Sequence, residues 1–207
     1  MNVLIFAPHR DDEIIGVGGT ILKRKAAGDR VAVCIVTASE GYEVSDFVKT
    51  VHSEMLAAHE YCGVDKYYGL PFNPIILETY PRKNLNNAMM DVIKQEKPDE
   101  VYIPFWGDMK KDHRVVTDAK MVVMRAKYNH PIKRIYAYET LSETGINLPT
   151  QENTFIPNVF EDITDYLDEK LKTFSFFKTQ IADFPDLRSL EAVEALAKFR
   201  GATVNVK

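Results

Sequence analysis

The chain has 207 residues, a hydrophobic share of 45%, a charged share of 27% and a formal net charge of −4. This length suits one α/β domain with a sizeable core, and we treat residues 1–207 as a single domain. The mild negative charge lacks the broad positive field of a non-specific nucleic-acid binder, so we expect no nucleic-acid partner.

The ends and cysteines of the chain indicate the compartment. The opening apolar run, residues 3–7, is too short for a signal peptide or a spanning helix, so we expect a cytoplasmic protein without membrane insertion. Cys34 and Cys62 lack CxxC spacing and are expected to be reduced thiols. The sequence leaves a homo-oligomer open.

Apolar runs and amphipathic segments alternate through the first two thirds of the chain. Strands are predicted at residues 3–7, 31–37, 67–70, 100–104 and 133–140. Helices are predicted at residues 16–28, 45–62, 84–96, 114–128, 167–180 and 189–200. This order predicts a Rossmann-like, mostly parallel sheet flanked by helices on both faces. Ligands of such folds bind at the carboxyl ends of the strands, so we examine the loops that follow them.

The loop after the first strand reads Pro8-His9-Arg10-Asp11-Asp12-Glu13. Imidazole and carboxylate suit zinc or a similar divalent ion. Two adjacent acids repel one another, and a nearby cation relieves that repulsion and frees one carboxylate to act as a base. The alternative is that these acids simply begin a helix, where Asp is a good N-cap and acids suit the helix dipole.

Three glycines follow these acids in the segment Gly16-Val17-Gly18-Gly19. They resemble a weak phosphate-binding loop, but they do not come directly after the strand and the G-x-G-x-x-G pattern is absent. A nucleotide-binding protein therefore stays an alternative, and tight mononucleotide binding without metal would favour it.

The loop after the strand at residues 100–104 carries a second set of such side chains. It ends in Lys110-Lys111-Asp112-His113, immediately before a predicted helix. A catalytic zinc site needs three protein ligands and one open position, and His113 can join His9 and Asp12 as the third ligand. Asp112 can orient a neighbouring ligand. The alternative is a surface His113 near a helix start and an Asp112 that caps the helix.

The remaining histidines are less suited to a shared site. His52 and His59 lie seven residues apart on one predicted helix, and His130 precedes Pro131 in a turn. We expect all three to be structural or surface residues.

At these two loops the chain resembles the LmbE/PIG-L family of zinc-dependent de-N-acetylases. That family carries a P-H-x-D-D-E segment after its first strand, which residues 8–13 match, and a later H-x-D-H segment, to which residues 110–113 correspond with lysine in the first position. Residues 157–164, the predicted helix at 167–180 and residues 196–201 also look like later parts of the family's sequence. The resemblance covers nearly the whole chain, and its first motif is the most specific.

The resemblance implies roles for individual residues. His9, Asp12 and His113 would bind the metal, and Asp11 would be the general base that activates water. The implied reaction is hydrolysis of an N-acetyl group on an amino sugar or its conjugate. The implied cofactor is Zn²⁺, with another divalent metal possible.

Two positions depart from the family pattern. The family has histidine at the first position of H-x-D-H, and this chain has Lys110. A protonated lysine can donate a hydrogen bond to an oxyanion, although it shuttles a proton at neutral pH only if its pKa is lowered. We therefore count Lys110 and Asp112 with Asp11 as candidate catalytic residues. Arg10 stands where proline is commoner, and it either contacts an anionic substrate group or neutralises Asp11.

Further substrate contacts are predicted from position. Ser142 and Glu143 follow the strand that ends near residue 140, so they should lie at the same rim. Trp106 and Phe105 can stack on a sugar ring, although a core aromatic is the commoner case. Arg188 lies in a loop after Asp186 and is the last candidate.

Three hypotheses follow from these residues. The first is a de-N-acetylase that acts on a small N-acetylated sugar or conjugate. The second is a related metal-dependent amidase that cleaves a different amide. The third is a catalytically weak module that keeps the metal and the sugar pocket, and Lys110 is the residue that favours it.

Overall fold

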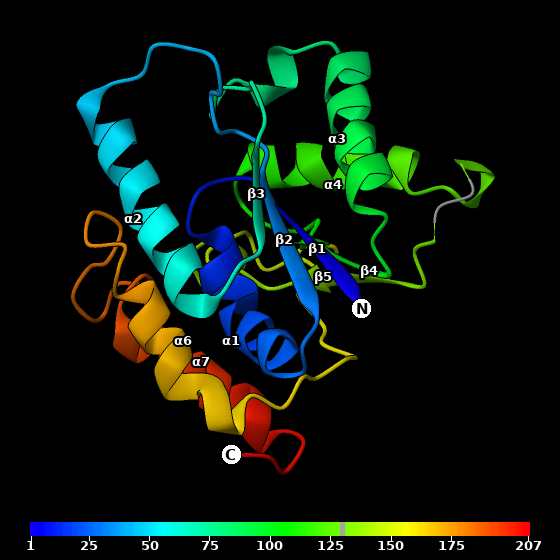
Figure 1. Ribbon diagram of the computed structural model, residues 1–207. Coiled ribbons are helices and arrows are strands. Elements are labelled where there is room, and N and C mark those ends of the chain that lie inside the picture. The colour runs from blue at the N-terminus through cyan, green and yellow to red at the C-terminus, as the bar shows by residue number, and fades with distance from the viewer. Residues whose placement is uncertain (129–130) are drawn as a thin grey trace.

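A five-stranded sheet forms the centre of the molecule in the computed structural model, which describes residues 1–128 and 131–207 (Figure 1). The strands are β1 (Asn2–Ala7), β2 (Arg30–Ile35), β3 (Lys66–Gly69), β4 (Glu100–Pro104) and β5 (Arg134–Tyr138). Their order across the sheet is β3-β2-β1-β4-β5, and every neighbouring pair is parallel. The predicted mostly parallel, Rossmann-like α/β fold with a single domain is confirmed.

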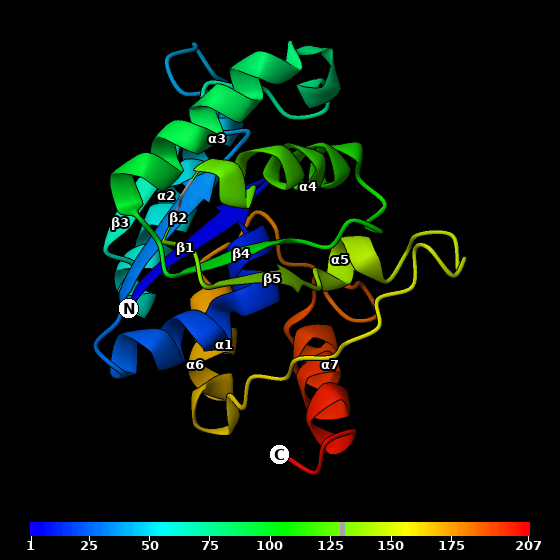
Figure 2. The ribbon, with the colours of Figure 1, turned by 90° about the vertical axis from the view of Figure 1, so that its right-hand side faces the viewer.

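Helices cover both faces of this sheet (Figure 2). They are α1 (Asp12–Ala26), α2 (Asp46–Cys62), α3 (Arg82–Glu96), α4 (Lys111–Val123), α5 (Leu141–Thr144), α6 (Leu167–Phe174) and α7 (Leu190–Ala202). One apolar core joins the sheet to α1, α2, α6 and α7, and a second joins it to α3 and α4. Because the inner strands are buried on both faces, they read as continuous apolar runs.

Three helices differ from their predicted bounds by three or more residues at an end. The helix predicted at residues 114–128 is α4, which begins at Lys111 and ends at Val123. The predicted helix at residues 167–180 ends at Phe174, because the chain turns there and carries Phe177 into the core beside Phe174. The first helix begins at Asp12, four residues before the predicted start. The acids of the first loop therefore do lie at a helix start.

The glycines of α1 make room for neighbouring segments. A Cβ atom on Gly16 would lie 2.4 Å from the ring of Tyr138, and one on Gly19 would lie 2.5 Å from Ile163. Both glycines lie inside α1, where neighbouring side chains leave no room for a Cβ atom. The phosphate-loop hypothesis instead requires them to lie in a loop.

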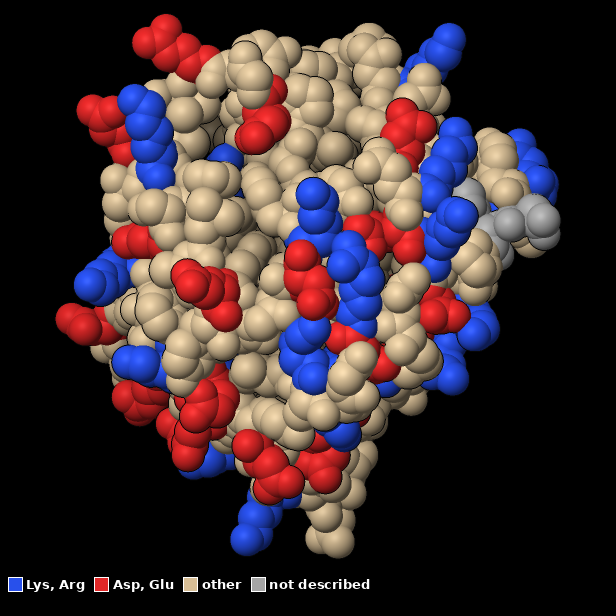
Figure 3. All heavy atoms as spheres, in the orientation of Figure 1, with Lys and Arg blue, Asp and Glu red and all other residues tan. Residues whose placement is uncertain are grey.

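The surface of the molecule is mixed in charge. Acidic and basic side chains are interspersed on the face in Figure 3, in keeping with the small net charge. Within the described ranges, no helix is long and apolar enough to cross a membrane.

Candidate metal centre

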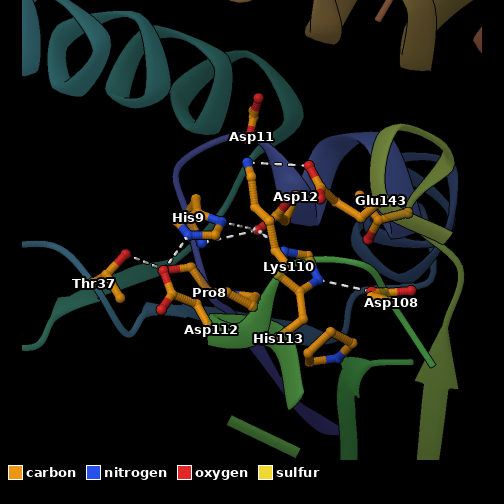
Figure 4. A network of polar contacts seen from close by, with 12 residues as sticks. Pro8, His9, Asp11, Asp12, Thr37, Asp108, Lys110, Asp112, His113 and Glu143 are labelled. Atoms are coloured by element: carbon orange, nitrogen blue, oxygen red, sulfur yellow. Dashed lines mark hydrogen bonds and ion pairs between the residues drawn. The ribbon is translucent and has the colours of Figure 1, made fainter. Parts of the chain in front are cut away.

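The two predicted loops meet at one edge of the sheet. β1 and β4 are parallel neighbours, so the loops that follow Ala7 and Pro104 open side by side at the carboxyl edge. Figure 4 shows His9 and Asp12 from the first loop facing His113 from the start of α4. One ligand atom from each of these three residues lies within 4.8 Å of the others.

A carboxylate stands behind His9. The Nε2 of His9 lies 2.8 Å from Asp112 Oδ2, and the Nδ1 of His9 lies 3.1 Å from Asp12 Oδ2. Asp112 does not cap α4, because that helix begins one residue earlier, and it also accepts the backbone N–H of Ile75 at 2.9 Å. Asp112 therefore fixes the ring of His9, as outer carboxylates do for metal-binding histidines.

His113 has the same arrangement in a fully buried position. Its Nδ1 lies 2.7 Å from Asp108 Oδ2, and its Nε2 lies 3.1 Å from Asp12 Oδ2. Asp108 was not among the sequence candidates. It precedes His113 by five residues in the same loop, and this short spacing is the only signal of its role in the sequence.

Two atoms at the centre of the cluster fit a bound cation. Asp12 Oδ1 and His113 Nε2 are buried and have no hydrogen-bond partner among the described residues. Buried polar atoms are rarely left in this state unless another group satisfies them. One carboxylate and two imidazoles form a donor set suited to zinc or a similar divalent metal.

The charged groups of this cluster shift one another's pKa values. Burial lowers the pKa of His113, but the charge of Asp12 and the hydrogen bond to Asp108 outweigh it and raise the pKa to about 10. Burial alone would raise the pKa of Asp12, yet His113 and His9 hold it well below its usual range. The negative charge of Asp12 is thus strongly favoured beside a positive group.

Asp11 lies next to the cluster in a strained backbone conformation. Its φ is 124°, which is unusual for a residue other than glycine, and its side chain does not cap α1. A guanidinium N–H of Arg188 donates to its carboxylate. Burial and the charge of Asp12 raise the pKa of Asp11 to about 7, against the opposing charge of Arg188. This carboxylate is therefore poised to exchange a proton near neutral pH.

Glu143 connects the two cations of the site. Lys110 Nζ lies 3.1 Å from Glu143 Oε1, and Arg188 Nη2 lies 3.5 Å from the same oxygen. Glu143 comes from α5 after β5, and Arg188 comes from the loop between α6 and α7. The structure thus brings Lys110, Glu143 and Arg188 together beside Asp11, and the position of Glu143 agrees with the rim expected for it.

The other substrate candidates lie apart from these contacts. Arg10 donates to the carbonyl of Ala38 at 2.6 Å and makes no ion pair with Asp11 among the described residues. Ser142 is buried, and its hydroxyl has no hydrogen-bond partner in the described chain. Trp106 is 46% exposed, and Phe105 packs edge-on against Phe155 with ring centroids 5.1 Å apart.

The remaining histidines and cysteines have simple environments. His59 is buried, with its Nε2 2.7 Å from Glu13 Oε1, which is the structural role expected of it. His52 is half-buried, and His130 lies outside the described residues. Cys34 and Cys62 are free and buried, so the prediction of two thiols is confirmed.

The fold and this site together define an α/β protein with a His-Asp-His cluster able to hold a metal ion at the carboxyl edge of a parallel sheet. Comparison with known families is consistent with that class. The chain belongs to the PIG-L family, since the family model described as GlcNAc-PI de-N-acetylase matches residues 4–124. The resemblance to LmbE/PIG-L proteins is thereby confirmed, and deacetylases of this family are metal-dependent.

Individual relatives extend the comparison. The chain is 27% identical to the diacetylchitobiose deacetylase of Thermococcus kodakarensis over 199 residues, which cover 89% of this chain and 71% of the relative. It also shares its fold with the N,N'-diacetylchitobiose deacetylase of Pyrococcus horikoshii, with a TM-score of 0.74, 23% identity, and coverage of 99% and 79% of the two chains.

A hydratase shares the fold as well. The 4-carboxy-2-hydroxymuconate hydratase of Pseudomonas putida KT2440 matches with a TM-score of 0.72 and 20% identity, covering 99% of this chain and 88% of that one. The fold therefore does not determine the reaction, which depends on the side chains of the site.

Proposed function

We propose that this protein hydrolyses the N-acetyl group of an amino sugar or amino-sugar conjugate, with a zinc ion held by His9, Asp12 and His113. The observation that carries the proposal is the paired backing of the two histidines. Each has one ring nitrogen on a carboxylate and turns the other toward Asp12. This is the arrangement by which proteins orient metal-binding imidazoles.

The metal ion and the side chains of the protein would contribute different parts of the reaction. A divalent cation at this position polarises the amide carbonyl and lowers the pKa of a water molecule. Asp11 accepts a proton from the attacking water and returns it to the leaving nitrogen. Water oxygen joins the acetyl carbon as the carbon–nitrogen bond breaks, which gives acetate and a free amine.

Two cations assist this reaction in different ways. Arg188 holds the Asp11 carboxylate in place through its guanidinium group. Lys110 extends over the cluster (Figure 4) and supplies a positive donor for the tetrahedral oxyanion. It takes the position at which the family pattern has histidine.

The substrate and setting complete the proposal. Curated relatives are named for diacetylchitobiose, so we propose a small N-acetylated sugar or conjugate as the substrate, acted on in the cytoplasm by a single domain spanning residues 1–207. Arg10, Ser142, Glu143 and Trp106 stay candidate substrate contacts.

Metal analysis paired with acetate release tests this function. Purified protein is stripped with a chelator, reloaded with zinc or another divalent ion, and incubated with N-acetylglucosamine, diacetylchitobiose and matched N-formyl and N-propionyl sugars. We expect one metal per chain and metal-dependent acetate release. Release of only the other acyl groups would favour the related amidase, and metal binding without turnover on any substrate would favour the weak binding module.

A further inference from the structure

A groove beside the edge strand β5 lies outside the candidate metal centre. It has a volume of about 600 Å³ and is bounded by α1, β5, α7 and the segment 155–163. Figure 2 shows α7 and this segment on the side of β5 covered by α1 and α6. None of the metal-cluster residues lines the groove. Its volume is within the range of small-molecule sites, on the order of 300–1,000 Å³.

The walls of the groove are strongly apolar and reach the surface. Large hydrophobic side chains that are at least 40% exposed line it, namely Ile135, Ile156, Val159, Phe160 and Val204. Clusters of exposed apolar side chains are characteristic of binding sites rather than of ordinary surface. The groove thus offers an apolar path from solvent toward the interior.

A lysine from α6 belongs to the lining of this groove. Lys170 lines the groove with only 7% of its surface exposed, and its stem passes close to Gly18 of α1. Its ammonium makes no hydrogen bond or ion pair with the residues that the structure describes, and it is not among the fully enclosed atoms without a partner, so it keeps access to the groove. An unpaired buried charge is costly, so a group that pairs with it gains free energy.

The acids that line the groove already have partners. Glu139 is the charge that acts on Lys170, but it receives two hydrogen bonds from Arg200, at 3.0 and 2.6 Å. Glu161 pairs with Lys23 at 2.6 Å, and the carboxylate of Asp162 accepts hydrogen bonds from Thr164. Among the described groove residues, the ammonium groups of Lys170 and Lys207 therefore have no carboxylate partner, and of the two only Lys170 belongs to a buried residue.

We propose that this groove binds a free single-chain amphiphile with an anionic head, of the fatty-carboxylate type. The carboxylate pairs with the Lys170 ammonium, and the alkyl chain lies along β5 and the segment 156–160. The charge complementarity selects an anion over a neutral or cationic amphiphile, and the apolar walls select it over a small inorganic anion. This site is separate from the metal centre and does not depend on the proposed reaction.

Titration calorimetry with decanoate tests the proposal, with decanol and decyltrimethylammonium as comparisons. We expect saturable 1:1 binding of decanoate and none of decyltrimethylammonium. The Lys170→Met variant keeps the apolar stem and removes the charge, so it should bind decanoate at least roughly tenfold more weakly. Lys172→Met, two residues along α6 at an exposed position, should bind like the wild type.

A second variant distinguishes a bound amphiphile from a second copy of the chain in the groove. Ile156→Asp places a negative charge on an exposed groove residue and should also weaken decanoate binding, while thermal unfolding shows that the fold is kept. Absence of saturable binding, or equal binding by Lys170→Met, overturns the proposal. So does a dimer in sedimentation that Ile156→Asp disrupts and decanoate leaves intact, since a second copy then fills the groove. Binding only to anionic vesicles, and not to free decanoate, overturns it too.

Discussion

The cluster around Asp12 and the groove beside β5 both bury charged groups, but they leave opposite charges unmatched. In the cluster, the carboxylate oxygen Asp12 Oδ1 and the ring nitrogen His113 Nε2 have no hydrogen-bond partner among the described residues. In the groove, the ammonium of the buried residue Lys170 has no hydrogen-bond or ion-pair partner among the described residues. The unmatched charge is a carboxylate in the cluster and an ammonium in the groove. The cluster therefore suits a cation, and the groove suits an anion.

The side chains of the cluster also have more direct polar contacts than Lys170 has. His9 contacts the carboxylate of Asp112, and His113 contacts that of Asp108. Arg188 donates a hydrogen bond to Asp11. Lys170 has no such fixed neighbour. This difference separates a site prepared for chemistry from a site that gains its order when a ligand arrives.

The largest expected effect comes from Asp11. Asp11→Asn keeps the shape of the side chain but removes the base, so acetate release should fall about 10²–10⁴-fold. Metal content should stay at one ion per chain, because Asp11 is not among the proposed ligands. Asp91→Asn, at an exposed position on α3, serves as the control. If metal is lost together with activity, Asp11 has a ligand role and the proposed division between base and ligands is wrong.

The second prediction concerns stability and the groove. Burial lowers the pKa of Lys170 to about 8 from 10.5, so the unfolded chain holds this proton more tightly. The resulting penalty, on the order of 3 kcal/mol, is present in full below pH 8 and fades as pH rises toward 10.5. In urea unfolding without added amphiphile, Lys170→Met should therefore be more stable than the wild type at neutral pH.

The pH dependence gives this prediction its control. The difference between Lys170→Met and the wild type should shrink as pH rises through the interval between the two pKa values, whereas Lys172→Met should match the wild type within about 0.5 kcal/mol throughout. Glu139 stays paired with Arg200 in both variants, so it does not confound the comparison. An unchanged or lower stability for Lys170→Met at neutral pH would show that its ammonium is well satisfied.

The third prediction tests the carboxylates behind the histidines. Asp108→Asn leaves His113 with a neutral partner, and we expect metal affinity to fall about 10–100-fold. Competition with a chromophoric chelator measures this directly, independent of turnover. Asp112→Asn should act similarly through His9. If both variants bind metal as tightly as the wild type, the paired backing of the histidines is not what prepares the site.

The sequence allowed the metal cluster to be predicted because its residues follow two strands that a parallel sheet places side by side. His9 and Asp12 lie within five residues of Ala7, and His113 lies in the first turn of α4, the helix after β4. Asp108 was missed because its contact with His113 depends on how the loop turns. Lys170 was missed because lysine is ordinarily exposed, and only the packing of α6 against α1 buries it.

The contact between Arg188 and Asp11 shows a further limit of local patterns. These residues are 177 positions apart, and their meeting depends on the turn that ends α6 at Phe174 and redirects the following chain. The sequence placed Arg188 only as a substrate contact, and predicted a helix that continued past that turn. The error in the helix bound and the incomplete role of Arg188 thus have one cause, the packing of Phe177 into the core.

The smallest expected effect belongs to Lys110, whose side chain is 42% exposed and pairs with Glu143. Lys110→Met removes one charged donor near solvent, so we expect kcat to fall about tenfold, the low end for a hydrogen bond to a charged group, with KM and metal content nearly unchanged. Lys110→His restores the family residue and should recover activity. If Lys110→Met is fully active, Lys110 only neutralises Glu143, and the donor to the oxyanion is another group, for which Arg188 is the nearest charged candidate.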